Sequence, residues 1–599
     1  MIWKTEHLTE NSKNIPSHIQ KLVNQKRNHH LKDDPSFFSI GIVGGGPKGM
    51  YALEELFREI NQANLKQKIK VYWWNESSYF GCGPNYQTDQ PDFLLINYCI
   101  GHIDAWDRSN NDSETELNFV KWLNENKALK DHVENTDYAS RSLVGYYLQD
   151  TLLQIIRNKP SSVDLILLNS KVKNVVTTDS SELKIITSDE VIQVDNLLLS
   201  TGHCYQNKPL IQFENIVLSL NYLNNAYPIE RLNVIQPEDK VGIIGWGLTF
   251  IDVAIALTEG RGGFFDSNGT YQKSGKEPIL YPFSRNQLPI MPRGPIYGEN
   301  AYNLRYIDDN LLNQLQLIAV HRKIDFYKEV LPILEKELKF AYYSRFLKTE
   351  DELTIETYID SLSDEDLFSF NSLLFPKIPK GLDVQDSYIK YLDFLIEEAE
   401  KGELKSPLMA AASVWREASP FIAKIYQFGG FTGKSQKYLD QHLFGAFCRT
   451  SYGPPIENMK KIGALLKAGI IQTPWMNSIE INYLNENERF ILKNSEYQEE
   501  VDFIIDARIA RPQIEQNNAE LYQNLYLQNS IEPFNNEDYL PGCVWINESG
   551  KVKNEKDIQL YFYGSNTEGI LLDNDSLSRR KNNFAPKWVQ NVMHQMISK

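Results

Sequence analysis

A short strand, a glycine-rich turn and an amphipathic helix follow one another in SIGIVGGGPKGMYALEELF, residues 39–57. Gly44, Gly46 and Gly49 have the spacing G-x-G-x-x-G. At this spacing the first glycine allows a sharp turn, the second lets the backbone approach a pyrophosphate, and the third lets the helix pack closely on the strand. Apolar residues recur at helical spacing up to Ile60, so one helix face is expected to lie on a sheet. The stretch predicts an α/β fold that binds a dinucleotide.

The segment after this helix supplies the expected partner for a ribose. Residues 69–74 are rich in β-forming side chains and end at Asn75 and Glu76. In dinucleotide folds an acid at the end of the second strand accepts hydrogen bonds from the ribose hydroxyls, so we expect Glu76 in this role. Asn75 takes its place if the strand ends one residue earlier, and a glycine turn in an unrelated α/β protein is the alternative. The predicted phosphate and ribose contacts are Gly44, Gly45, Gly46, Pro47, Lys48, Gly49 and Glu76.

A second unit of the same kind lies further along the chain. The strand over residues 240–244 leads into a turn that contains Gly245, Gly247 and Thr249, and an almost wholly apolar helix follows. Phe250 stands where the third glycine of the motif is expected, so a turn that only packs a helix on a sheet is the alternative. Two such units are most simply explained by two cofactors, and FAD with a nicotinamide nucleotide is the usual pair.

The strand after the second turn indicates which nicotinamide nucleotide is used. In PILYPFSRNQLP, residues 278–289, the strand leads into Ser284 and Arg285, at the point where an acid would bind the 2′-hydroxyl of NADH. An arginine instead presents a planar set of donors that matches a 2′-phosphate. Ser284 and Arg285 are therefore expected to bind the nucleotide and to favour NADPH. An ion pair between Arg285 and a carboxylate of the chain is the alternative.

Composition limits the other classes of function. The chain has 599 residues, 42% of them hydrophobic, so two or more packed units are expected. Its formal net charge of -16 argues against a nucleic-acid partner, because binding to phosphate backbones requires a concentrated basic surface. No apolar run approaches the roughly 20 residues of a spanning helix, and the first 35 residues lack the apolar centre of a signal peptide. We therefore expect a cytoplasmic protein without membrane contact.

The cysteines and the motif content exclude further chemistries. No G-x-S-x-G, H-E-x-x-H or P-loop motif occurs, so hydrolase, metalloprotease and nucleoside-triphosphate chemistry lack their residues. Without C-x-x-C spacing, the cysteines predict neither a metal site nor a disulfide scaffold. We expect structural thiols at Cys82, Cys99, Cys204, Cys448 and Cys543.

Several segments together resemble the bacterial FAD/NAD(P)-binding proteins whose dinucleotide domain is shared with FAD-dependent urate hydroxylase and aspartate N-monooxygenase. They are GGGPKGMYALEEL, FGCGPNYQTDQPDFLLIN, YASRSLVGYYL, LLLSTGH, VGIIGWGLTFIDVAIAL, FSRNQLP and YGPPIENMKKIGALLKAGII. The resemblance covers most of residues 38–580 and is weak over residues 300–440. It implies an α/β fold with two Rossmann-like domains, one for FAD and one for NAD(P), and a flavin monooxygenase activity. It names no substrate.

The resemblance also carries individual residues to the FAD site. Thr201 and Gly202 follow a strand and match the turn that closes over FAD. Arg141 lies where the family has an arginine near the cofactors, although a salt bridge is an equally simple interpretation. Gly564 follows a strand that resembles the last strand at the flavin ribityl chain, but Ser565 stands where related flavoproteins commonly have Asp. That departure leaves this contact open.

Three further residues, from separate segments, are expected near the flavin ring. Gly83 would pass close to the ring, and the side-chain amide of Asn97 would face the isoalloxazine or the nicotinamide. A turn or cap is the alternative for Asn97. Asn97 and His102 are the catalytic candidates, with a structural histidine as the alternative for His102.

These anchors predict the order of the domains, with boundaries good to about ten residues. A polar and loosely ordered N-terminal arm comes first. A mainly helical insertion, either a cap over the active site or a structural insertion, interrupts the NAD(P)-binding domain. The predicted segments are 1–36 for the arm, 37–238 and 500–599 for the FAD-binding domain, 239–300 and 440–499 for the NAD(P)-binding domain, and 301–439 for the insertion.

The expected activity is oxygen insertion into a small polar substrate, which is an amine, an amino acid or a heterocycle. NADPH reduces FAD, O2 adds to the reduced flavin as a C4a-hydroperoxide, and its terminal oxygen passes to the substrate. The protein aligns the nicotinamide with the flavin, excludes water and orients the acceptor atom. A flavin-dependent NAD(P)H oxidase or reductase without oxygen insertion, and a non-catalytic FAD-binding protein, are the alternatives. The oligomeric state is left open.

Overall fold

The structure is a computed structural model of the whole chain. It describes residues 1–598 apart from the segments 24–36, 109–113, 178–182, 204–220, 379–382, 476–478, 485–487, 518, 575 and 580–581. Cys204, one of the expected structural thiols, lies outside the described residues. Cys82, Cys99 and Cys543 are buried free thiols, and Cys448 is a half-buried one.

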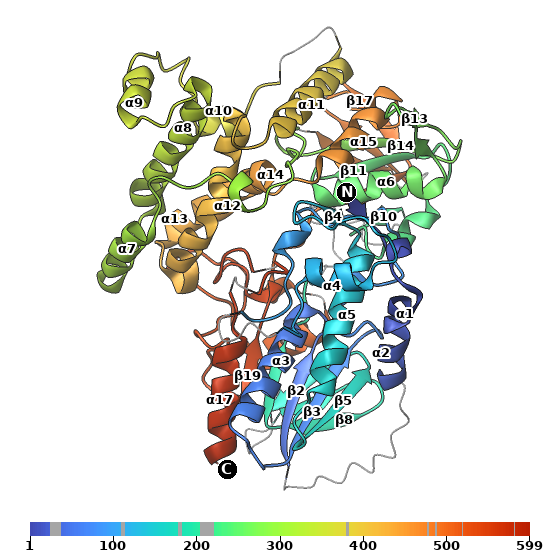
Figure 1. The fold of residues 1–599 in the computed structure, drawn as a ribbon, viewed down its shortest axis with the longest axis vertical. Coiled ribbons are helices and arrows are strands. Elements are labelled where there is room, and N and C mark those ends of the chain that lie inside the picture. The colour runs from blue at the N-terminus through green and yellow to red at the C-terminus, as the bar shows by residue number, and fades with distance from the viewer. Residues whose placement is uncertain are drawn as a thin grey trace.

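A five-stranded parallel sheet forms the lower half of the molecule as drawn in Figure 1, with strand order β19-β9-β2-β3-β5. The central strand β2 (Phe38–Val43) leads through helix α3 (Pro47–Gln62) to its neighbour β3 (Ile69–Asn75). This is the βαβ unit predicted at the first glycine turn. The other strands are β5 (Val163–Asn169), β9 (Asn196–Leu199) and β19 (Leu560–Phe562).

Helix α3 packs next to two other helices, α5 (Arg141–Arg157) and α17 (Ala585–Ser598). The apolar stripe predicted for α3 is buried at Leu53, Leu56, Phe57 and Ile60. Because β19 and α17 come from the last part of the chain, segments far apart in the sequence complete one body (Figure 1).

A four-stranded parallel sheet forms the second body, with strand order β10-β18-β11-β14. Strand β11 leads through helix α6 (Leu248–Ala256) to β14, which is the second predicted βαβ unit. The sequence therefore correctly predicted an α/β fold with two Rossmann-like units. The strands are β10 (Tyr222–Leu223), β11 (Lys240–Ile244), β14 (Ile279–Phe283) and β18 (Phe503–Asp506).

A mainly helical region lies between β14 and β18 and occupies much of the upper part of Figure 1. Most of its buried side chains join those of the second sheet in one hydrophobic core. No helix in the described parts of the chain is long and apolar enough to cross a membrane. The helices are α7 (Asp309–His321), α8 (Leu331–Leu347), α9 (Glu352–Asp360), α10 (Phe370–Leu374), α11 (Val384–Lys401), α12 (Pro407–Tyr426), α13 (Gly433–Tyr438), α14 (Phe444–Ser451) and α15 (Ile456–Lys467).

Small elements complete the two bodies. Two antiparallel three-stranded sheets are formed by β6 (Asn174–Thr177), β7 (Leu183–Ile186) and β8 (Val191–Val194), and by β15 (Glu480–Leu484), β16 (Arg489–Lys493) and β17 (Gln498–Val501). The remaining elements are the pair β12 (Phe264–Phe265) and β13 (Tyr271–Gln272), and the helices α4 (Phe119–Asn126) and α16 (Glu520–Leu527).

The N-terminal arm is ordered where the structure describes it, so the expectation of a loosely ordered arm is wrong for residues 1–23. Strand β1 (Ile2–Trp3) pairs with β4 (Tyr138–Ala139), and the helices α1 (Glu10–Lys13) and α2 (Ile15–Val23) follow. The arm is ordered because apolar side chains, which are interspersed with polar ones in its sequence, pack into the hydrophobic core around the five-stranded sheet. They are Trp3, Leu8, Ile15, Ile19 and Val23.

The predicted domain order stays a prediction. Two strands of the second sheet, β10 and β18, lie outside the boundaries predicted for the second domain. Strand β10 precedes residue 239 and yet belongs to the second sheet. Strand β18 follows residue 499 and also belongs to it. Both strands fall outside the expected 239–499 span of the second domain.

Candidate active site

The first glycine turn has the shape that a pyrophosphate requires. Gly44 has φ +112°, and a Cβ there would lie 2.3 Å from the carbonyl oxygen of Ser200. A Cβ at Gly49 would lie 2.5 Å from the carbonyl oxygen of Gly44, so the helix packs tightly on the turn. A Cβ at Gly46 would have nothing within 4 Å, and no side chain caps α3, which begins at Pro47. The open space and the uncapped N–H groups fit a bound phosphate group.

The second glycine turn repeats this geometry. Gly245 has φ +108°, and a Cβ at Gly247 would have nothing within 4 Å. Helix α6 begins directly afterwards at Leu248, again without a side-chain cap. The chain thus contains two turns whose shape suits a dinucleotide phosphate, although Phe250 replaces the third glycine of the second.

The two ribose candidates have different surroundings. Strand β3 ends at Asn75, whose side-chain oxygen accepts a hydrogen bond from the N–H of Gly45 at 3.1 Å. Glu76 is 66% exposed and pairs with Lys171 at 3.1 Å. Asn75 therefore fixes the turn, and the Glu76 carboxylate lies on the surface beyond the strand. The ribose role of Glu76 stays a prediction.

The other residues predicted for FAD gather around the first turn. The amide of Asn566 donates to the carbonyl oxygen of Gly202 at 3.0 Å and to the hydroxyl of Thr201 at 3.2 Å. A Cβ at Gly564 would lie 3.7 Å from the side chain of Lys48. A Cβ at Gly83, which has φ +61°, would approach the Cα atom of Gly46 to 2.9 Å. These residues meet at the carboxyl end of the first sheet, where ligands of such folds bind.

Arg141 lies between the two bodies in a buried ion pair. Its guanidinium is 2.6 Å from the carboxylate of Asp252 on α6, and it also donates to the hydroxyl of Tyr227 at 3.2 Å. Burial is the largest single effect and opposes the charge of Arg141, but the Asp252 carboxylate together with the hydroxyls of Tyr227 and Tyr86 raises the pKa of Arg141 overall. The salt bridge named as the alternative for Arg141 is therefore present. Contact between Arg141 and a cofactor stays a prediction.

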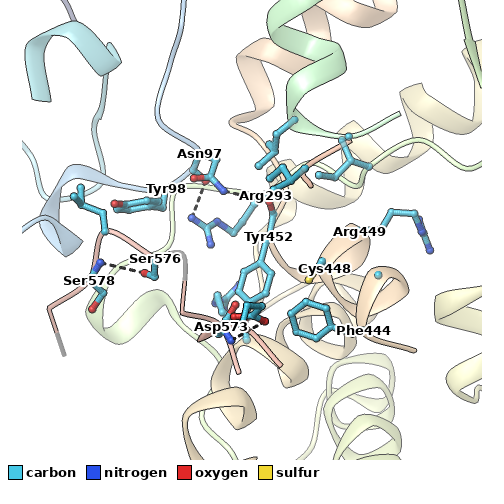
Figure 2. Close-up of a pocket in the computed structure, with 18 of the residues that line it drawn as sticks. Asn97, Tyr98, Arg293, Phe444, Cys448, Arg449, Tyr452, Asp573, Ser576 and Ser578 are labelled. Atoms are coloured by element: carbon cyan, nitrogen blue, oxygen red, sulfur yellow. Dashed lines mark hydrogen bonds between the residues drawn. The ribbon is translucent and has the colours of Figure 1, made fainter. Parts of the chain in front are cut away.

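A cavity of about 1950 Å³ lies next to the second turn and receives side chains from both bodies and from the helical region (Figure 2). Of the predicted site residues, those that line it are Asn97, His102, Gly245, Gly247, Thr249, Ser284 and Arg285. Those that lie outside its walls are Gly44, Gly45, Gly46, Pro47, Lys48, Gly49, Glu76, Gly83, Arg141, Thr201, Gly202 and Gly564.

Ser284 and Arg285 have the position that the sequence predicted. Strand β14 ends at Phe283, parallel to β11, so both residues directly follow a strand beside the second turn. The Arg285 side chain is exposed and forms no ion pair or hydrogen bond with any described residue. The alternative, an ion pair with a carboxylate, is thus absent from the described parts of the chain.

Asn97 and His102 face the cavity from the first body. The Asn97 amide donates to the carbonyl oxygen of Tyr452 at 3.4 Å, and the Asn97 carbonyl accepts from Arg293 at 2.8 Å. His102 donates from Nε2 to the carbonyl oxygen of Ile296 at 3.0 Å. Burial lowers the pKa of His102, so the ring is neutral at pH 7. Both residues are available to a ligand, and their catalytic roles stay predictions.

The cavity wall is rich in arginine although the whole chain is acidic. Arginines outnumber carboxylates among the described lining residues, which favours anionic ligands. The arginines are Arg108, Arg285, Arg293, Arg416, Arg449, Arg508, Arg511 and Arg579. The carboxylates are Asp104, Asp107, Glu417, Glu568 and Asp573.

No described carboxylate pairs with Arg293, and it has fewer hydrogen-bond and ion-pair partners among the described residues than Arg416 or Arg449. Arg416 pairs with Glu403 at 2.7 Å and with Glu417. Arg449 donates to three main-chain carbonyls in the described structure. Arg293 donates only to the Asn97 carbonyl from its side chain, and its Nε is buried without a hydrogen-bond partner among the described residues.

Sequence reasoning missed three of the residues that line the cavity beside Asn97, which are Arg293, Tyr452 and Asp573. Figure 2 shows Tyr452 between Arg293 and Asp573, and the three residues come from three separate loops. The only local signal is that Arg293 and Tyr452 stand beside glycine and proline in MPRGP and YGPP. Such composition indicates a loop and does not indicate what the loop faces.

Residues 41–204 match the FAD-NAD(P)-binding family. This part of the chain is therefore similar to an FAD/NAD(P)-binding domain. It is 24% identical over 476 residues to a nitrosuccinic acid synthase of Aspergillus oryzae, an alignment that covers 72% of each chain. It is also 24% identical over 506 residues to the nitrosuccinate-forming L-aspartate N-monooxygenase of Streptomyces davaonensis, which covers 72% of this chain and 76% of the relative.

Among solved structures, L-lysine 6-monooxygenase from Pseudomonas syringae matches 93% of this chain and 99% of its own, with 10% identity and a TM-score of 0.43. The resemblance to FAD/NAD(P)-binding proteins and to aspartate N-monooxygenase is confirmed by the family match and the relatives. The FAD/NAD(P)-binding domain supports FAD and a nicotinamide nucleotide as cofactors. The expectation of an FAD-dependent oxidoreductase agrees with these relatives.

Proposed function

We propose that the protein is an FAD-dependent, NADPH-using monooxygenase that hydroxylates the nitrogen of a small acidic amino acid. One observation carries this proposal: the second glycine turn lines the same cavity as Arg293, whose guanidinium has no carboxylate partner among the described residues. A nucleotide that donates a hydride and an anionic substrate can therefore enter one space. FAD, when bound, supplies the chemistry of accepting that hydride and of activating O2.

The residues around the second turn support NADPH as the reductant. The uncapped N-terminus of α6 at Leu248 would bind the pyrophosphate, as the first turn would do for FAD. Arg285, at the end of the neighbouring strand, would bind the 2′-phosphate through its planar set of donors. No carboxylate follows β14 directly, so nothing there would select the ribose hydroxyl of NADH.

Arg293 supports an anionic substrate. A guanidinium stays charged in proteins, and a buried charge without a partner is costly. Burial and the nearby Arg416 lower the pKa of Arg293, which shows that its present surroundings disfavour the charge. A substrate carboxylate would compensate it with bidentate hydrogen bonds. The relatives named for L-aspartate and nitrosuccinate are consistent with such a substrate.

The walls of the cavity would orient the substrate and limit water. His102 is neutral and adds no second charge beside the substrate. Asn97 is held by Arg293 and Tyr452, so its backbone position is fixed by the residues that line the same space. Orientation and exclusion of water are the contributions that the protein makes when a cofactor performs the redox step.

Anaerobic mixing of the FAD-loaded protein with NADPH, followed by O2 and single candidate substrates, tests the proposal. The panel is L-aspartate, L-glutamate, L-lysine and a purine, and mass spectrometry detects the oxygenated product. We expect reduction by NADPH and an oxygenated product with an acidic amino acid only. Oxygen consumption without product would favour the oxidase alternative. Failure of NADPH to reduce the flavin would favour the non-catalytic alternative.

A further inference from the structure

His102 ends a short 3₁₀ turn that packs on the wall of the cavity. The turn η3 (Ile100–His102) lies against Tyr297, because a Cβ at Gly101 would approach the Tyr297 ring to 2.5 Å. The rings of His102 and Tyr297 meet edge to face, with their centroids 5.1 Å apart. Both residues line the cavity. The imidazole therefore has a defined position at the cavity wall.

The hydrogen bond of His102 decides which ring nitrogen carries the proton. Nε2 lies 3.0 Å from the carbonyl oxygen of Ile296. A carbonyl oxygen only accepts, so Nε2 carries the hydrogen, and Nδ1 of the neutral ring keeps a lone pair. Nδ1 forms no hydrogen bond with any described residue, and His102 is exposed where it lines the cavity. A base with an available lone pair therefore lines the space proposed for the substrate.

Hydroxylation of a nitrogen needs such a base. An amino acid in neutral water carries its nitrogen as an ammonium, which has no lone pair to accept an oxygen atom. For the whole reaction, R–NH3⁺, O2 and NADPH give R–NHOH, H2O and NADP⁺, so no net proton is taken up or released. The proton that leaves the nitrogen thus equals the proton that is needed to form water. A group that holds this proton during one turnover completes the balance.

We propose that His102 is the base of this reaction, and that its Nδ1 takes one proton from the substrate ammonium and returns it when water is formed. This assignment rests on the proposed function. The N–H bond of the ammonium breaks, its electron pair stays on the substrate nitrogen, and the proton forms a new N–H bond at Nδ1. The Ile296 carbonyl continues to accept from Nε2, so it stabilises the imidazolium that results.

The charged groups around His102 suit a proton transfer from an ammonium. Burial is the largest effect that lowers the pKa of His102, and Arg293 and Arg416 lower it further. The Ile296 carbonyl and the Glu417 carboxylate act in the opposite direction. The same two guanidinium groups would destabilise an ammonium bound in this cavity, so they lower the pKa of the proton donor together with that of the acceptor. A proton can therefore pass to His102 although its pKa is low.

Product formation in single turnovers across pH tests this role. Wild type and His102→Gln are loaded with FAD, reduced to completion with NADPH without O2, and then mixed with O2 and L-aspartate. The rate of flavin reduction thus does not enter the measurement. Glutamine keeps an N–H donor for the Ile296 carbonyl and is not a base. A positioned base contributes about 10²–10⁴-fold, so the variant should form the oxygenated product at least about hundredfold more slowly at pH 7.

The pH profiles separate a base from a structural residue. Between pH 7 and pH 9 the wild-type rate should stay nearly constant, because His102 is unprotonated throughout. The rate of His102→Gln should rise by about tenfold per pH unit, because only substrate that is already a free amine in solution reacts. A wild-type rate that itself rises in this way would overturn the assignment without any variant.

Imidazole and a distant histidine provide the controls. Imidazole added to His102→Gln should restore part of the lost rate, since it supplies the missing base. His321→Gln removes an exposed histidine at the end of α7, outside the cavity walls, and should change neither the rate nor the pH profile. A loss in His102→Gln that is equal at every pH and that imidazole does not restore would indicate a structural role and overturn the assignment.

Two further outcomes distinguish this assignment from the proposed function. If His102→Gln forms product from L-aspartate at the wild-type rate at pH 7, His102 is not the base, and the proposed substrate class stands. If the wild type forms no oxygenated product from L-aspartate or L-glutamate at any pH, the proposed function is wrong, and the role of His102 is overturned with it.

Discussion

At the scale of single residues, Arg285 and Arg293 are two arginines of one cavity for which we propose different ligands. Neither forms an ion pair with a described residue, whereas Arg416 and Arg511 are paired with carboxylates. Arg285 is exposed at the end of β14, beside the second glycine turn. Arg293 is largely buried beside Asn97. Their positions fit a nucleotide phosphate and a substrate carboxylate, respectively.

Replacement of Arg285 by alanine should separate the two nicotinamide nucleotides. The variant loses the donors for the 2′-phosphate, so the NADPH concentration for half-maximal flavin reduction should rise about tenfold to hundredfold. NADH lacks that phosphate and provides the internal control, for which little change is expected. Stopped-flow reduction under anaerobic conditions measures both, and an equal loss with NADH would contradict the phosphate role.

The second glycines of the two turns form a matched pair of test positions. A Cβ at Gly46 or at Gly247 meets no protein atom within 4 Å, so valine should be tolerated by the fold at either position. It would fill the space proposed for a pyrophosphate. Gly46→Val should lose FAD, while Gly247→Val should keep FAD and lose reduction by NADPH. Absorbance at flavin wavelengths and anaerobic titration distinguish the two, and a Gly46→Val protein with undiminished flavin would show that the phosphate site is misplaced.

At the scale of elements, the π-helical turn η10 (Leu439–Leu443) connects the cavity with the C-terminal segment. Its residues 441–443 line the cavity. Asp440 instead accepts hydrogen bonds from Tyr426 of α12 and from Tyr539, each at 3.0 Å, and Gln436 of α13 lies nearby. Burial raises the pKa of Asp440 from 3.8 to about 6, against the opposing effect of these donors and of Arg511.

The raised pKa of Asp440 predicts a pH dependence of stability. The Asp440 carboxyl binds its proton more tightly in the folded protein than in the unfolded chain. Protonation of Asp440 therefore contributes fully to the free energy of unfolding below about pH 4, and this contribution is lost as pH rises through about 6. The shift corresponds to about 3 kcal/mol at most. Asp440→Asn cannot titrate, so the free energy of unfolding of the wild type should fall relative to the variant between pH 4 and pH 7. Urea denaturation across this range measures the difference, and parallel curves would contradict the prediction.

At the scale of the whole molecule, a buried ion pair joins the two dinucleotide bodies. Arg141 begins α5 of the first body, and Asp252 lies in α6 of the second. Tyr227 donates to the same carboxylate. The relative position of the two turns therefore depends on an ion pair whose carboxylate is buried and whose guanidinium is 19% exposed. Removal of one partner of a buried ion pair strongly destabilises a protein.

Replacement of Arg141 alone should lower the stability of the protein more than replacement of both Arg141 and Asp252. Arg141→Met leaves the Asp252 charge buried, and we expect a loss of about 3–5 kcal/mol of stability. Arg141→Met with Asp252→Leu should recover a large part of this loss, because no charge is then left uncompensated. The midpoint of urea unfolding compares the variants. A double variant that is less stable than Arg141→Met would contradict this expectation, because it would show that the uncompensated Asp252 charge is not the main cause of the loss.

Local steric rules made the two turns predictable from the sequence. Positive φ at Gly44 and Gly245 and the close approach at Gly49 follow from the lack of a side chain, and the spacing of these glycines places them on a strand-to-helix turn. The strand before Ser284 was predictable for a different reason. Short apolar runs between turns form buried parallel strands in such folds. The ordered arm at residues 1–23 was not predicted, because its apolar side chains are separated by polar ones and only the tertiary contacts bury them.

The sequence by itself determined that this chain forms two βαβ units with phosphate-sized turns, since each unit is encoded within about 45 consecutive residues. Only the tertiary structure decided that Arg293, Tyr452 and Asp573 line one cavity, and that Arg141 pairs with Asp252. These residues lie on loops and helices far apart in the chain, and no local preference indicates which of them meet. Their contacts depend on how the two sheets and the helices pack, because burial and charge compensation act on the assembled molecule.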